Sequence, residues 1–194
     1  MDRKLFWVVT GILLVIAAAA GAATIINHLP HSFNGSVINP PAPAPDFTLT
    51  DQHGQSFEFS SLRGKYVFLY FGYSHCTNAC PAAMALMTQA RNQLGSQGSQ
   101  IQVVFVATDP PGDTPQAMAT FVDRFDPSYV GATGTQAQLS AVWAEYGVVV
   151  EDGGETHSDY IYLIDPSGNM RMTYSQPITA EEIAADLRVI MRKA

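Results

Sequence analysis

Residues 66–94, "YVFLYFGYSHCTNACPAAMALMTQARNQL", carry the strongest signal of the fold class. The first eight are mostly aromatic or β-branched, which is typical of a strand buried on both faces of a sheet. The residues after Pro81 are good helix formers with an apolar stripe of methionine and leucine. The sequence therefore predicts a buried strand that leads directly into a helix. Both cysteines of the chain, Cys76 and Cys80, lie at this junction.

The segments on either side extend this α/β pattern. Thr114 ahead of Pro115, and Thr179 with Glu182, are N-cap signals for two further helices. Strand, helix and strand followed by a hairpin and a closing helix predict a thioredoxin-like α/β fold, with a mixed central sheet flanked by helices. The further predicted elements are, in chain order, a hairpin from Phe47, a strand at 101–107, helices at 115–125 and 135–146, a strand at 148–151, a hairpin at 157–174 and a helix from Thr179 to Arg192.

The amino terminus predicts one transmembrane helix. The uncharged residues 5–26 would form a helix about 33 Å long, which matches a hydrocarbon core of about 30 Å. Arg3 and Lys4 precede this run, so residues 1–4 are expected to be a cytoplasmic stub. A cleaved signal peptide is the competing interpretation, although the run is longer than a usual signal h-region. We predict a single-pass protein of the cell (inner) membrane whose C-terminal domain lies on the periplasmic side.

A proline-rich segment and one domain follow the predicted anchor. Residues 27–45 contain five prolines and predict an extended linker, and residues 46–194 are about the size of one domain. Beyond the anchor the chain has eight Lys and Arg against sixteen Asp and Glu. This acidic balance argues against nucleic acid as a partner and permits a metal cation or a basic protein surface.

The two cysteines allow three interpretations. A structural disulfide would close a very short loop and so remove little entropy from the unfolded chain. A redox pair is better supported, because unpaired N–H groups at the start of a helix stabilise a thiolate. A metal site needs a third ligand, and two thiolates with an imidazole suit Cu(I). The candidate third ligands within the domain are His53, His75 and His157.

Three segments, "YFGYSHCTNACP", "ATDPPGDTP" and "THSDYIYLIDPSG", carry a family resemblance. Together with the anchor they resemble the Sco/SenC family of thioredoxin-like, membrane-anchored copper proteins, which assist assembly of the binuclear copper centre of cytochrome c oxidase. The resemblance implies that Cys76, Cys80 and His157 bind copper, as Cu(I), Cu(II) or both. It also implies that Asp109 and Asp113, in the loop of the second segment, orient the ligands or face a partner.

Two functions follow from the resemblance and from the cysteine pair. The first is a metallochaperone that receives copper from an upstream donor and passes it to the copper-bearing subunit of cytochrome c oxidase. The alternative is a thiol-disulfide oxidoreductase that keeps the cysteines of the oxidase copper site reduced, with Cys76 attacking and Cys80 resolving. A peroxide-reducing relative is less well supported, because the activating threonine expected before its reactive cysteine is missing.

The chain departs from the family pattern beside two of these residues. Thr77 and Asn78 stand where the family commonly has proline and aspartate, and Thr156 stands where an acidic residue usually precedes the histidine. The missing negative charges predict weaker binding of Cu(II) relative to Cu(I).

Overall fold

The computed structural model describes residues 12–13, 32–151 and 156–193. Within these ranges no helix is long and apolar enough to cross a membrane. The predicted stub and nearly all of the predicted anchor lie outside the described residues, so both stay predictions. The compact unit described below runs from Phe33 to Ala194.

A mixed sheet forms the centre of this unit. Its strand order is β1-β10-β9-β4-β5-β6-β2-β3, and β7 pairs with β8 in a separate small ladder. Strands β4, β5 and β6 run parallel, whereas the other pairings are antiparallel. The bounds are β1 (Ser36–Pro43), β2 (Thr48–Asp51), β3 (Ser56–Glu58), β4 (Tyr66–Gly72), β5 (Ile101–Ala107), β6 (Val130–Thr133), β7 (Val150–Glu151), β8 (Thr156–His157), β9 (Ile161–Ile164) and β10 (Asn169–Tyr174).

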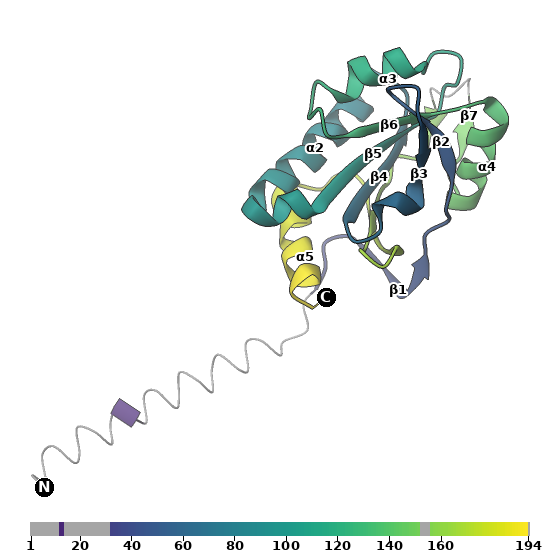
Figure 1. Ribbon diagram of the computed structural model, residues 1–194. Coiled ribbons are helices and arrows are strands. Elements are labelled where there is room, and N and C mark those ends of the chain that lie inside the picture. Colours follow the sequence, from purple (N-terminus) through teal and green to yellow (C-terminus); the bar gives the residue numbers. More distant parts are fainter. Residues whose placement is uncertain (1–11, 14–31, 152–155, 194) are drawn as a thin grey trace, which may run out of the picture. The chain divides into compact units, whose positions relative to one another are not determined.

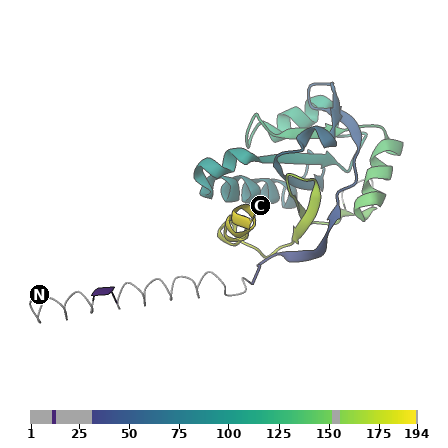
Figure 2. The ribbon, with the colours of Figure 1, turned by 60° about the horizontal axis from the view of Figure 1, so that its bottom comes forward.

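Helices cover both faces of the sheet. Helix α2 packs against α5, and Figures 1 and 2 show these two on one side of the sheet with α4 on the other. Phe121 of α3 packs on Phe105 of β5, on the same face as α2. The bounds are α2 (Ala79–Gln93), α3 (Pro115–Val122), α4 (Gln136–Tyr146) and α5 (Ala180–Lys193), with short 3-10 helices at Phe59–Leu62 and Gly95–Gln100.

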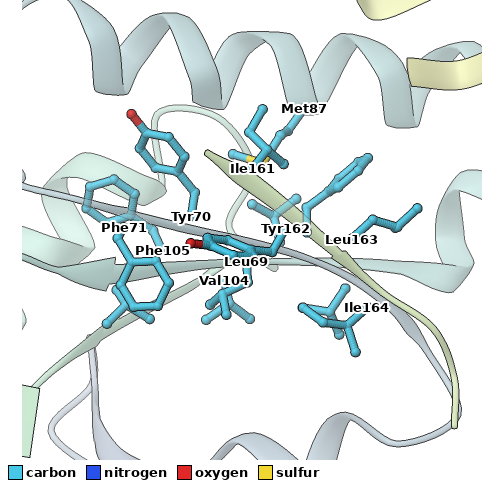
Figure 3. Close-up of a cluster of buried hydrophobic side chains, with 14 of the residues drawn as sticks. Leu69, Tyr70, Phe71, Met87, Val104, Phe105, Ile161, Tyr162, Leu163 and Ile164 are labelled. Carbon is cyan, nitrogen blue, oxygen red and sulfur yellow. The ribbon is translucent and has the colours of Figure 1, made fainter. Parts of the chain in front are cut away.

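The central strands are buried on both faces, as the apolar run predicts. Every residue of β4 and β5 is buried. Tyr70 and Phe71 point to opposite faces because successive side chains of a strand alternate. Tyr70 stacks on Phe105, and Figure 3 shows it on the side of the sheet that also holds Met87 of α2. Phe71 instead contacts Tyr146 of α4.

Several local predictions are confirmed. The mixed sheet flanked by helices is present, and β5 begins and ends at the predicted residues. The side chain of Thr114 accepts the N–H of Ala117 as an N-cap. Thr179 and Glu182 form the predicted capping box at the start of α5. The two cap signals are reliable because each depends on residues within one helical turn of one another.

The prediction of a linker through residue 45 is wrong for residues 36–43. This segment is the edge strand β1, paired with β10, because prolines are tolerated at a sheet edge where one row of N–H groups faces solvent. Just before it, the buried carboxylate of Asp186 in α5 accepts the backbone N–H groups of Asn34 and Gly35. The domain therefore begins ahead of the predicted residue 46.

Two further differences concern short elements. The predicted order lacks β6, because four residues with glycine and alanine in the middle give a weak strand signal. Helix α3 ends at Val122 instead of Phe125.

Candidate metal centre

The two cysteines lie where β4 is followed by α2. The chain leaves β4 at Gly72, and Asn78 is the N-cap residue of α2. Cys76 therefore precedes the helix and Cys80 lies in its first turn, a register that the sequence alone leaves open. Both are free thiols, Cys80 fully buried and Cys76 half-buried.

The start of α2 stabilises a thiolate at Cys76. The first N–H groups of a helix have no intrahelical acceptor, and the N–H of Cys80 donates to Sγ of Cys76 across 3.4 Å. Partial burial by itself raises the pKa of the Cys76 thiol, but hydrogen bonds from the backbone of Cys80 and Asn78 outweigh it, so this pKa is lowered. Burial raises the pKa of the Cys80 thiol. One thiol thus ionises readily while the other retains its proton.

Gly72 makes room for the buried sulfur. A Cβ atom at this position would lie 2.7 Å from Sγ of Cys80 and 3.0 Å from the ring of Phe105. Both distances are too short for carbon, so only glycine lets the first turn of α2 approach the end of β4 this closely. Gly72 therefore determines how deeply Cys80 is buried.

His157 reaches the cysteine pair from 77 residues further along the chain than Cys80. It lies in β8, which pairs with β7. Its Nε2 is 3.7 Å from Sγ of Cys80, and its Nδ1 is 3.2 Å from the carbonyl oxygen of Ser158. Because a carbonyl only accepts hydrogen bonds, we assign the ring proton to Nδ1. The lone pair of Nε2 then faces the sulfur.

Two tyrosines flank the imidazole of His157. The rings of Tyr70 and Tyr73 meet it edge-on, at centroid distances of 6.0 Å and interplanar angles of 87° and 82°. The hydroxyl of Tyr70 donates to Oδ1 of Asp159 across 2.6 Å. Burial, with Cys80 and Asp159 nearby, raises the pKa of Tyr70, so the hydroxyl stays protonated.

The sequence analysis missed this arrangement, because it predicts only that residues 66–73 form a strand buried on both faces of the sheet. A signal was present, because Asp159 follows His157 by two residues, the spacing of side chains on one side of an extended chain. Nothing in the sequence indicates that Tyr70 is their partner.

The two predicted aspartates shape the loop beside the cysteines. The carboxylate of Asp113 is fully buried and accepts the N–H groups of Ser74 at 2.7 Å and of Asp109 at 3.0 Å. Burial raises the pKa of Asp113, although these backbone hydrogen bonds oppose the shift. Oδ2 of Asp109 lies 3.6 Å from Nε2 of His75. Asp113 thus ties the loop to the segment before the cysteines, and His75 faces Asp109.

The structure separates the three candidate histidines. His157 lies beside Cys80, His75 pairs with Asp109, and His53 is exposed in the turn between β2 and β3. In the part of the chain that the structure describes, no three His, Cys, Asp or Glu side chains already form a group that could hold a metal ion. A metal ion bound between Cys76, Cys80 and His157 would draw these side chains closer together.

The protein has a mixed sheet with a thiol pair where a strand leads into a helix, and an imidazole lies beside the buried thiol. These features define a thioredoxin-like thiol protein whose sulfur and nitrogen donors suit soft metals. Residues 37–192 match the family model described as SCO1/SenC, and the chain belongs to this family. The solved protein BsSco, described as a member of the Sco family of cytochrome c oxidase assembly proteins, is 18% identical to this chain and shows the shared fold.

Individual relatives agree with this assignment. Copper-bound ScoI of Bradyrhizobium japonicum is 32% identical, with a TM-score of 0.68 over 76% of this chain and 99% of that one. Copper-bound ScoI of Arabidopsis thaliana is 26% identical, with a TM-score of 0.74 over 79% of this chain and 100% of that one. The mitochondrial SCO2 homolog of Bos taurus is 34% identical over 153 residues, 74% of this chain and 58% of that protein. The chain thus spans little more than half of this mitochondrial relative.

Proposed function

We propose that this protein is a membrane-anchored copper metallochaperone that assists assembly of the binuclear copper centre of cytochrome c oxidase. The observation that carries the proposal is the 3.7 Å separation between Nε2 of His157 and Sγ of Cys80, beside the second thiol. Family membership and the copper-bound relatives support it. The expected partners are an upstream copper donor and the copper-bearing oxidase subunit, with residues 5–26 as the anchor.

The donor set fits copper as cargo. Thiolate and imidazole are ligands that Cu(I) prefers. Cys76 offers a sulfur that already ionises readily, and Cys80 releases its proton when it binds the ion. His157 can bind through Nε2, because the proton assigned to Nδ1 leaves the lone pair of Nε2 facing the sulfur. Transfer by ligand exchange would begin at Cys76, since it is the more exposed of the two sulfurs.

Copper stoichiometry of the purified full-length chain in detergent tests the proposal. We expect stoichiometric Cu(I) in the wild type and a loss of at least about tenfold in affinity in His157→Ala, as is typical when a metal site loses a supporting group. His53→Ala is the matched control, because it removes an exposed imidazole in the hairpin turn. Wild-type affinity in His157→Ala would contradict the proposal.

Thiol-disulfide exchange is a second candidate, favoured by the asymmetry of the two thiols. The thiolate of Cys76 would attack a disulfide of the oxidase copper site and form a mixed disulfide, releasing one target thiolate. Cys80, once deprotonated, would then displace the second target thiol and leave a Cys76–Cys80 disulfide, so the target gains two electrons. This reaction does not need His157. Rapid reduction of a target disulfide, unchanged in His157→Ala and without copper binding, would favour it.

A further inference from the structure

We propose that Tyr70 and Asp159 form a clasp that holds the imidazole of His157 toward Cys80, and that both are positioning residues of the copper site. The inference rests on the proposed copper function. It concerns a hydrogen bond between the central strand β4 and the segment that follows β8, whose partners are 89 positions apart in the chain.

The segment that directly follows the histidine lies outside regular strand pairing. Residues 158–160 lie between β8 and β9 and belong to neither strand. The Ser158 N–H donates to the carbonyl of Val149, and the Ser158 hydroxyl accepts the N–H of Val149, both at 3.1 Å. These bonds tie the segment to its hairpin partner. The bond from Tyr70 to Asp159 ties it by a side chain to the central sheet, two residues before the backbone pairing of β4 with β9 begins at Ile161.

Tyr70 is well suited to act as the fixed half of the clasp. Its side chain is fully buried, and its backbone pairs with Phe105 on one side and Ile161 on the other. A hydroxyl that donates to a carboxylate at 2.6 Å is a strong, charge-assisted hydrogen bond. Because Asp159 is two residues from His157, this bond restricts where the backbone can place the imidazole.

The ring of Tyr70 has a separate role from its hydroxyl. The ring makes a T-shaped contact with the imidazole of His157, as the ring of Tyr73 also does. Tyr70→Phe therefore retains this contact and removes the hydroxyl, which donates to Asp159 and also interacts with the Cys80 thiol, whereas Asp159→Ala leaves the hydroxyl beside Cys80 in place. The proposal predicts that loss of the hydroxyl alone weakens copper binding.

Four variants of the full-length chain in detergent separate positioning from charge. The measurement is Cu(I) affinity by competition with a chelator, together with the thiolate-to-Cu(II) charge-transfer band. We expect Tyr70→Phe and Asp159→Ala each to weaken Cu(I) binding about tenfold, and the double variant to lose no more than either alone. Asp159→Asn keeps an oxygen acceptor and is expected to stay within about threefold of the wild type. A role of the negative charge alone would make Asp159→Asn as weak as Asp159→Ala and would refute the clasp.

Tyr162→Phe is the matched control, because it removes another buried tyrosine hydroxyl that donates to a carbonyl, that of Tyr146. Thermal unfolding checks that each variant folds. If Tyr70→Phe lowers Tm but leaves copper affinity and the charge-transfer band unchanged, its role is only structural and the clasp is refuted. Asp159 is half-buried and outside regular strands, so Asp159→Ala tests the clasp even if Tyr70→Phe misfolds.

The outcomes distinguish this inference from the proposed function. Affinity that depends on His157 but not on Tyr70 or Asp159 would refute the clasp alone. A wild-type chain that binds no copper would refute the proposed function and the clasp with it.

Discussion

Gly72→Ala tests how closely the cysteine helix approaches the central strand. The new Cβ would lie 2.7 Å from Sγ of Cys80 and 3.0 Å from the ring of Phe105. To restore an ordinary contact of about 3.5–4.0 Å, the sulfur must move by roughly 1 Å. Overpacking of this kind costs about 1–3 kcal/mol. In a domain of this size, 2 kcal/mol corresponds to a loss of roughly 4–8 °C in Tm.

A double-mutant cycle with Cys80→Ala identifies the sulfur as the cause. The assay is thermal unfolding followed by circular dichroism, for the wild type, both single variants and the double variant. Because Cys80→Ala removes Sγ, Gly72→Ala should cost less in that background, with a coupling of about 1 kcal/mol or more. The same loss of stability in both backgrounds would show that the sulfur does not limit the approach. In the wild-type background we also expect weaker copper binding, since the displaced sulfur is a proposed ligand.

Two further predictions concern the thiols and the edge strand. Iodoacetamide labelling mapped by mass spectrometry should modify Cys76 at a lower pH than an ordinary thiol of pKa about 8.5, because the pKa of Cys76 is lowered in the folded protein. Cys80 should stay unreactive to higher pH, because burial raises its pKa. In urea the two cysteines should react at equal rates, and equal rates in the native protein would contradict the prediction. A fragment of residues 46–194 should have a free energy of unfolding at least about 2 kcal/mol below that of residues 33–194. The shorter fragment lacks β1, and it also lacks the N–H groups of Asn34 and Gly35 that donate to the Asp186 carboxylate. Equal urea midpoints of the two fragments would show that β1 does not contribute to stability.

The elements next to the cysteines could be predicted from the amino-acid sequence. The two-sided burial of β4 and β5 follows from continuous apolar runs, and the helix starts at Thr114 and Thr179 follow from capping residues. Each of these signals is encoded within a few residues, because strand alternation, helix periodicity and caps are local. The nearness of Cys76 to Cys80 is local in the same sense.

The distant groups that meet the cysteines follow from the packing of the folded chain. The residues alone left three histidines open, and the family resemblance pointed to His157. The approach of that imidazole to Cys80 depends on how the β7–β8 hairpin lies against the end of β4, and the bond from Tyr70 to Asp159 depends on the pairing of β4 with β9. Strand pairing brings together residues whose separation along the chain leaves no periodic signal, so sheet register, not local propensity, assembles this site.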